Sequence, residues 1–170
     1  MKDIKEVFEK AIQKAKERNF KYLYIAVDVH GTIFKSSRKT RQIWSKNPNP
    51  SELIAKVRSV KEFDFLPYAE EALKLLSDHP RIKLILWTST QNAWELVFEL
   101  KQHGIKIDYL NSNPDFQFNS YADFTRKFCF DVLLDDKAGF DPEVDWKEIL
   151  SVDLSGLYKE VDYERLFRQD

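Results

Sequence analysis

Four short apolar segments, each followed by a polar residue, constrain the fold of this chain more than any other feature. They span residues 22–27, 82–87, 105–110 and 130–134, and the third is the weakest. Continuous apolar runs of this length are typical of strands buried on both sides of a parallel sheet. Helix-like segments separate them. We therefore predict an α/β fold, a three-layer Rossmann-like parallel sheet with helices on both faces.

Apolar residues at helical spacing predict helices over residues 2–18, 51–61, 91–103 and 143–150, and a further helix with Pro67 in its first turn. Gly104 is expected to end the third of these. Residues 29–50 are polar and rich in turn formers, which indicates a long loop or small hairpin. The chain has no repeat and no linker. We therefore predict one domain over 1–170, with 29–61 as a loop and small helical insert near the site.

The composition excludes several classes of protein. A net charge of -1 gives no reason to expect nucleic acid or a membrane surface as partner. The single cysteine, Cys129, excludes an internal disulfide and a thiolate metal cluster. The apolar runs are far shorter than the ~20 residues of a membrane span. We expect a cytoplasmic protein, a monomer or homo-oligomer, that acts on a small molecule.

The residues that follow the strands indicate the chemistry. Asp28 ends the first strand, Thr88 follows the second, and Asp135 and Asp136 follow the fourth. Ligands of parallel sheets bind beyond the carboxyl ends of the strands, so these side chains should converge if the strands are neighbours. Crowded carboxylates repel one another, and an all-oxygen set suits Mg²⁺. An aspartate beside that ion can attack phosphorus. Thr88 would then bind a phosphate oxygen, and Lys127 or Arg126 would offset its charge.

Four segments together resemble the motifs of the haloacid dehalogenase-like (HAD) superfamily of phosphatases. Residues 28–32, Asp-Val-His-Gly-Thr, are similar to its first motif, which usually reads Asp-x-Asp-Gly-Thr. Residues 84–89 resemble the second motif, Lys127 the third, and residues 131–141 (DVLLDDKAGFD) the fourth. The order and spacing fit over roughly residues 20–150. The chain between the first two strands is too short for a separate cap domain, so we expect a capless or small-cap member.

The resemblance implies roles for these residues. Asp28 would be the nucleophile and a Mg²⁺ ligand, and the backbone carbonyl of His30 would be a second ligand. Asp136 would bind the ion directly, with Asp135 as a ligand or as partner of the lysine. Asp141 would act through water. The expected activity is Mg²⁺-dependent hydrolysis or transfer of a phosphate monoester through an aspartyl-phosphate, with a small phosphorylated substrate.

His30 departs from the family pattern, because the residue at its position is usually the aspartate that moves protons. Imidazole has an unperturbed pKa near ~6.5, so it can give and take a proton around neutral pH. We therefore expect His30 to serve as the acid and base. The alternative is a catalytically impaired module that still binds phosphate and metal. A phosphoacceptor receiver domain is a third possibility, although its acid pair would follow the first strand.

Each residue also has a plain structural interpretation. Thr88 suits the start of a helix, Lys127 an ordinary surface position, and Asp141 a turn before Pro142. Asp135 and Asp136 could form a solvated turn. These interpretations remain open at the level of sequence.

Overall fold

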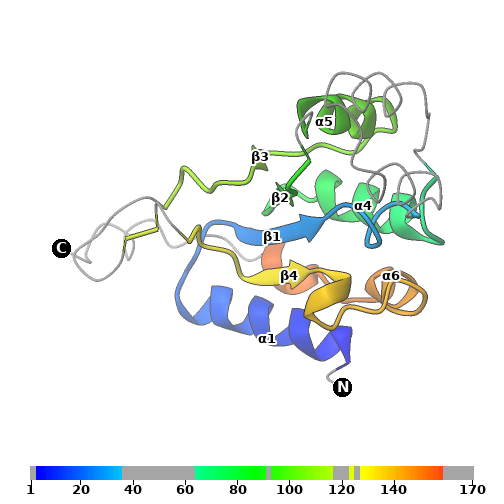
Figure 1. Cartoon of the computed structure of the whole chain (residues 1–170). Coiled ribbons are helices and arrows are strands. Elements are labelled where there is room, and N and C mark those ends of the chain that lie inside the picture. The colour runs from blue at the N-terminus through cyan, green and yellow to red at the C-terminus, as the bar shows by residue number, and fades with distance from the viewer. Residues whose placement is uncertain (1–2, 36–63, 91–92, 117–122, 125–126, 159–170) are drawn as a thin grey trace.

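A parallel β-sheet forms the centre of the molecule (Figure 1). The computed structural model describes residues 3–35, 64–90, 93–116, 123–124 and 127–158. In these residues the sheet has four strands in the order β3-β2-β1-β4, and all neighbours are parallel. The strands are β1 (Leu23–Asp28), β2 (Ile82–Trp87), β3 (Tyr109–Leu110) and β4 (Val132–Leu134). The predicted α/β, Rossmann-like parallel sheet is confirmed.

The strand register brings the polar strand ends to one edge of the sheet. Asp28 of β1 lies opposite Trp87 of β2, and Val27 lies opposite Leu134 of β4. One residue beyond that second pair are Asp28 and Asp135. Because β1 is hydrogen-bonded to both β2 and β4, its carboxyl end is flanked by theirs. The convergence expected from the sequence therefore follows directly from the strand order.

The main hydrophobic core lies on one face of the sheet. Leu23, Ile25 and Val27 of β1 pack there with side chains from the helices. The described helices are α1 (Ile4–Glu17), α4 (Ala69–Asp78), α5 (Ala93–Gln102) and α6 (Asp145–Ile149), with 3-10 turns η1 (Asp136–Ala138) and η2 (Ser155–Tyr158). Each of these α-helices contributes to this core.

The ends of the helices follow local rules. Asp3 caps α1 by accepting a hydrogen bond from the Lys5 amide, and the helix buries one apolar side. After α5 the chain turns at Gly104, whose φ of +76° belongs to the left-handed region that glycine adopts without strain. The predicted C-terminal stop at Gly104 is therefore confirmed.

The second face of the sheet is covered by aromatic side chains. Tyr24, Ala26 and Ile85 point to it. Around them pack residues that come mainly from the connection between β3 and β4, namely Phe116, Phe128 and Phe130, with Tyr22, Tyr109 and Leu133 from the strands or their flanks. In the described part of the chain no helix joins this cluster. The sequence predicted helices on both faces, and the described residues instead cover this face with aromatic rings.

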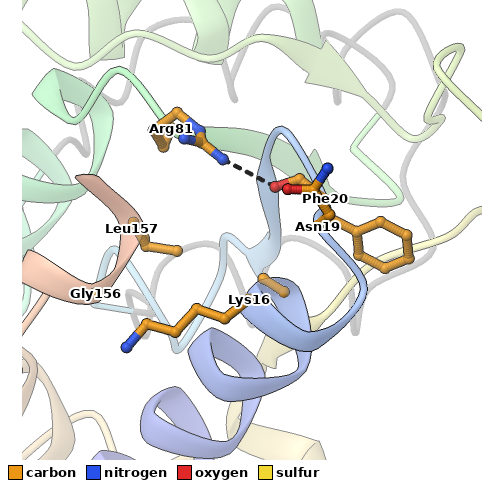
Figure 2. A pocket seen from close by; sticks show the side chains of 7 residues that line it. Lys16, Asn19, Phe20, Arg81, Gly156 and Leu157 are labelled. Atoms are coloured by element: carbon orange, nitrogen blue, oxygen red, sulfur yellow. Dashed lines mark hydrogen bonds between the residues drawn. The ribbon is translucent and has the colours of Figure 1, made fainter. Parts of the chain in front are cut away.

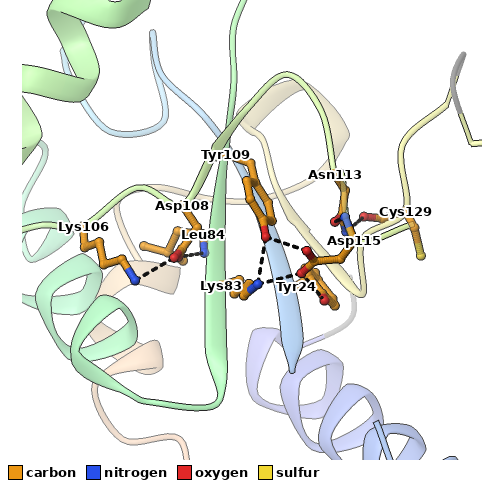
Figure 3. A network of polar contacts seen from close by, with 9 residues as sticks. All are labelled: Tyr24, Lys83, Leu84, Lys106, Asp108, Tyr109, Asn113, Asp115 and Cys129. Carbon is orange, nitrogen blue, oxygen red and sulfur yellow. Dashed lines mark hydrogen bonds and ion pairs between the residues drawn. The ribbon is translucent and has the colours of Figure 1, made fainter. Parts of the chain in front are cut away.

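A polar network fixes the β3–β4 connection to this second face (Figure 3). The carboxylate of Asp115 accepts hydrogen bonds from the hydroxyls of Tyr24 and Tyr109, each at 2.7 Å, and from the Lys83 ammonium at 2.6 Å. The Lys83 ammonium also lies 4.3 Å from the centre of the Tyr22 ring. The network thus joins β1, β2 and β3 to the loop that follows them.

Two strands are shorter than the sequence predicted, for the same reason. At the start of β4, the Asp131 carboxylate accepts the Tyr24 amide at 2.8 Å. Before β3, the Asp108 carboxylate accepts the Leu84 amide at 3.0 Å. A side chain thus takes a hydrogen bond that strand backbone would otherwise make, so the ladders begin later than the apolar runs.

Some predictions fall outside the described residues. They are the helix over 51–61, most of the insert over 29–61, and the start of the helix over 91–103. The single-domain prediction stays a prediction. In the described residues, no helix has the length and apolar character needed to cross a membrane.

Candidate metal and phosphate site

Three carboxylates meet at the carboxyl edge of the sheet. Asp28, Asp135 and Asp136 each offer one oxygen, and these three oxygens lie within 4.8 Å of one another. Asp28 and Asp135 are partly buried and Asp136 is exposed. The structure thus brings together three residues that the sequence singled out, from two strand ends that are more than a hundred residues apart in the chain.

The turn after β1 is shaped by Gly31. Its φ is +89°, and a Cβ atom at this position would lie 3.0 Å from Oδ2 of Asp136. Any other residue would therefore strain the backbone and crowd the carboxylate. Glycine at this position lets the β1 turn pass close to the β4 end.

Thr32 holds two of the carboxylates. Its side chain is fully buried, and its hydroxyl lies 3.2 Å from Asp28 Oδ2 and 3.3 Å from Asp136 Oδ1. The same oxygen accepts the Asp136 amide at 3.1 Å. The Thr32 carbonyl in turn accepts the indole N–H of buried Trp146 at 2.8 Å. One threonine therefore links the ends of β1 and β4, and α6 secures that threonine from the core.

Burial and crowding raise the pKa of Asp28. Burial is the largest cause, and the nearby carboxylates of Asp135 and Asp136 add to it. Hydrogen bonds from the Val29 amide and the Thr32 hydroxyl lower the pKa but do not reverse the direction. An ionised Asp28 is thus disfavoured by its surroundings unless positive charge is present.

Thr88 is held at the end of β2 by the side chains of Asn111, which follows β3, and of Thr90. Asn111 brackets its backbone, since the amide oxygen accepts the Thr88 N–H at 2.8 Å and the amide nitrogen donates to the Thr88 carbonyl at 2.7 Å. The Thr88 hydroxyl donates to Oγ1 of Thr90 at 2.9 Å. The predicted phosphate-binding hydroxyl is therefore buried and fixed at the carboxyl edge.

His30 is exposed and is connected to Thr88 through Thr90. Its Nε2 lies 3.1 Å from Oγ1 of Thr90. The row His30–Thr90–Thr88 thus joins the turn after β1 to the end of β2. Among the hydrogen bonds between described residues, none has the His30 carbonyl oxygen as acceptor.

Among the described residues, neither Lys127 nor Asp141 has a hydrogen bond or ion pair with the three carboxylates. Lys127 is exposed, and among the described residues it forms no ion pair or hydrogen bond with Asp28, Asp135 or Asp136. Arg126, its alternative, lies outside the described residues. Asp141 accepts the Glu143 amide at 3.1 Å, as expected of a turn residue. The role of Lys127 stays a prediction.

Three residues at the site were not assigned a role from the sequence. Thr32 and Thr90 lie inside or beside the quoted motifs, but nothing in the sequence showed which groups they would contact. Asn111 follows β3 and adopts φ of +50°, a conformation that asparagine tolerates better than most residues. Its place at a strand end, like that of Asp28, was the signal that could have identified it.

Two cavities lined by described residues lie away from the three carboxylates. One, of about 130 Å³, is lined by residues that include Lys16, Arg81 and Leu157 (Figure 2). Arg81 precedes β2 and donates to the carbonyls of Phe20 and Lys21, which precede β1. This cavity is therefore at the amino ends of the strands. The other lies between α1 and the aromatic cluster of the second face.

Comparison with known proteins identifies the fold and no more. No family model matches the chain. No curated protein matches it either. A solved structure, that of a conserved protein from Bacteroides thetaiotaomicron, is similar to this chain with a TM-score of 0.50 and 22% identity, covering 82% of this chain and 99% of the other. At that identity the likeness supports the α/β fold alone.

Proposed function

We propose that this chain is a Mg²⁺-dependent phosphomonoester hydrolase or phosphotransferase that acts through an aspartyl-phosphate on Asp28. The observation that carries the proposal is the meeting of Asp28, Asp135 and Asp136 within 4.8 Å at the carboxyl edge of a parallel sheet, with Thr88 at the adjoining strand end. The resemblance of residues 28–32 and 131–141 to HAD motifs supports it. We propose a small phosphorylated substrate and a cytoplasmic location, with neither nucleic acid nor membrane as partner.

The donor set fits a magnesium ion. All three side chains offer carboxylate oxygens, which Mg²⁺ prefers, and the set contains no thiolate. The pKa of Asp28 is raised by burial and by its neighbours, so a cation would relieve the cost of ionising it. Asp28, Asp135, Asp136 and the His30 carbonyl would hold the ion. When bound, Mg²⁺ supplies positive charge that offsets the charge of the phosphoryl group.

The protein residues account for both chemical steps. A carboxylate oxygen of Asp28 attacks phosphorus, the bond to the ester oxygen breaks, and that oxygen leaves with a proton. Water, or an acceptor alcohol, then attacks the phosphorus of the aspartyl-phosphate, loses a proton, and releases Asp28. Thr88 orients a phosphate oxygen. His30 gives the first proton and takes the second.

A catalytically impaired phosphate- and metal-binding module is the second candidate. One observation favours it, namely the exposed position of Lys127 without a contact to the three carboxylates among the described residues. A site that lacks a cation for the transferring group would stabilise the transition state less. Binding of Mg²⁺ with slow turnover would be expected.

Asp28→Asn tests the proposal. The variant keeps the shape of the side chain but removes the nucleophile, so Mg²⁺-dependent release of phosphate from an aryl phosphate should fall to background. Without Mg²⁺, the melting temperature at neutral pH should not fall, because the raised pKa of Asp28 means that its charge is disfavoured in the fold. Asp64→Asn, which removes an exposed carboxylate paired with Lys35, is the matched control and should retain activity. Turnover by Asp28→Asn equal to wild type would refute the mechanism.

A further inference from the structure

An aromatic side chain lies directly beside the proposed nucleophile. Trp87 is the last residue of β2 and the register partner of Asp28, the last residue of β1. Partners across neighbouring strands point to the same face, and side chains alternate along each strand. Ile85 and Ala26, two residues before Trp87 and Asp28, both belong to the second-face cluster. Trp87 and Asp28 therefore share that face at the carboxyl edge.

The Trp87 ring packs against two other aromatic rings and is still partly exposed. It packs on Phe128 with ring centres 4.8 Å apart and on Phe130 at 6.5 Å, the latter edge to face. Even so, 39% of Trp87 is exposed, whereas the apolar residues of β2 that precede it are buried. A large ring held by two others but left accessible next to a reactive group is a surface suited to stacking.

We propose that Trp87 and Phe128 form an aromatic wall that selects phosphate monoesters whose leaving group carries a planar ring. This inference rests on the proposed function, since the wall would contact the part of the substrate beyond the phosphate. Because Trp87 is the register partner of Asp28 and shares its face, an ester substituent on the phosphorus that Asp28 attacks would lie within reach of the Trp87 ring. The ring is then a specificity residue that makes contact with the substrate.

The alternative is that Trp87 serves only packing, and the exposure of other aromatic residues shows why this must be tested. Trp94 on α5 is 72% exposed and has no place near the three carboxylates in this proposal. Trp87 and Trp94 differ in their position relative to the proposed nucleophile, because Trp87 is the register partner of Asp28 and Trp94 is not. Trp94→Ala is therefore the matched control for loss of an exposed indole.

The experiment compares three esters with Mg²⁺ present, namely benzyl, cyclohexylmethyl and ethyl phosphate. Their leaving alcohols are of similar acidity, so differences in kcat/KM report contacts rather than intrinsic reactivity. We expect wild type to prefer the benzyl ester over both others. Trp87→Ala should lower kcat/KM for the benzyl ester about two- to tenfold and leave the ethyl ester within about twofold. Trp87→Phe should keep most of the preference, and Trp94→Ala all of it.

Binding of benzylphosphonate and ethylphosphonate, which are not hydrolysed, gives a second readout by calorimetry. Tighter binding of the benzyl compound, lost in Trp87→Ala and kept in Trp87→Phe, supports the aromatic wall. Equal binding of the two compounds, or an equal fall for all esters in Trp87→Ala, overturns it and leaves the proposed function standing. Failure to hydrolyse any ester, with benzylphosphonate still preferred, contradicts the proposed function instead.

Discussion

At the scale of single residues, Thr32 is the residue on which the shape of the site depends. It is fully buried, and its one hydroxyl contacts carboxylates from the carboxyl ends of β1 and β4 as well as the Asp136 amide. A hydroxyl has one proton, so it donates to one carboxylate at a time. Ionised Asp28 and Asp136 therefore compete for that proton, and a bound cation would remove the competition.

Thr32→Val should therefore destabilise the protein. The isosteric change leaves the Asp136 amide and one carboxylate without their partner, at a cost of about 1–3 kcal/mol in the free energy of unfolding. Thr32→Ser, which keeps the hydroxyl, should recover more than half of the loss. Urea denaturation of the three proteins measures this. Equal stability of wild type and Thr32→Val would show that the hydrogen bonds of Thr32 contribute little.

His30 carries the prediction that separates the two functional candidates. If its imidazole moves protons, His30→Ala should slow breakdown of the aspartyl-phosphate by about 10²–10⁴ at neutral pH. His30→Asp places a carboxylate there, so its pH–rate profile should lose the limb that depends on imidazole. The measurement is the pH–rate profile of the three proteins, with chemical trapping of phosphorylated Asp28. Wild type as slow as His30→Ala at every pH, with Mg²⁺ binding retained by both, would favour the impaired module.

At the scale of elements, the β3–β4 connection links the site to a polar network on the second face. Asn111 brackets Thr88, and Asp115, four residues later, is bound by side chains of Tyr24, Lys83 and Tyr109 (Figure 3). Burial alone would raise the pKa of Asp115, but the hydrogen bonds from these three side chains outweigh it and lower the pKa below its usual value. Asp115 is thus stabilised as a carboxylate in the fold.

The sign of the pH effect follows from that lowered pKa. A carboxyl group with a lower pKa in the folded than in the unfolded state stabilises the fold above its unfolded value, near ~3.9, and the stabilisation is lost as pH falls through the folded value. Asp115→Asn should therefore lower stability at pH 6 and reduce the loss between pH 4 and pH 2. Urea midpoints across this range measure it. Asp64→Asn, which removes an exposed pair with Lys35, is the control and should change little.

At the scale of the whole molecule, Mg²⁺ should act on stability because the three carboxylates come together only in the fold. Asp28 ends β1 and Asp136 follows β4, so the two residues are distant in sequence and meet only in the fold. An ion bound by both therefore stabilises only the native state. Tenfold excess over the dissociation constant corresponds to about 1.4 kcal/mol, or roughly 3–5 °C in melting temperature.

Asp136→Asn should reduce this shift, and Asp141→Asn should leave it unchanged if Asp141 is only a turn residue, as its hydrogen bond to Glu143 suggests. Scanning calorimetry with Mg²⁺ and with EDTA measures both. An unchanged melting temperature at several millimolar Mg²⁺ would exclude the proposed metal site. A reduced shift in Asp141→Asn would restore the predicted role of Asp141 through water.

The sequence by itself determined the strands that matter most and the residues at their ends. The apolar run over 82–87 matches β2 at both ends, and Asp28 closes β1, because a buried parallel strand must be continuously apolar and the polar residue that follows it must lie at the sheet edge. The start of β4 could not be read in the same way. There the Asp131 carboxylate, rather than a backbone carbonyl, accepts the hydrogen bond from the Tyr24 amide, and no local sequence pattern reveals this.

Only the tertiary structure decided which residues complete the site and which side chains lie next to one another at the strand ends. Thr32, Thr90 and Asn111 acquire their roles from partners distant in sequence, and the pairing of Trp87 with Asp28 depends on strand order and register. A periodic pattern specifies an element and its buried side, because these depend on neighbours along the chain. Contacts between strand ends depend on how the elements are arranged in space, which packing of the whole core determines.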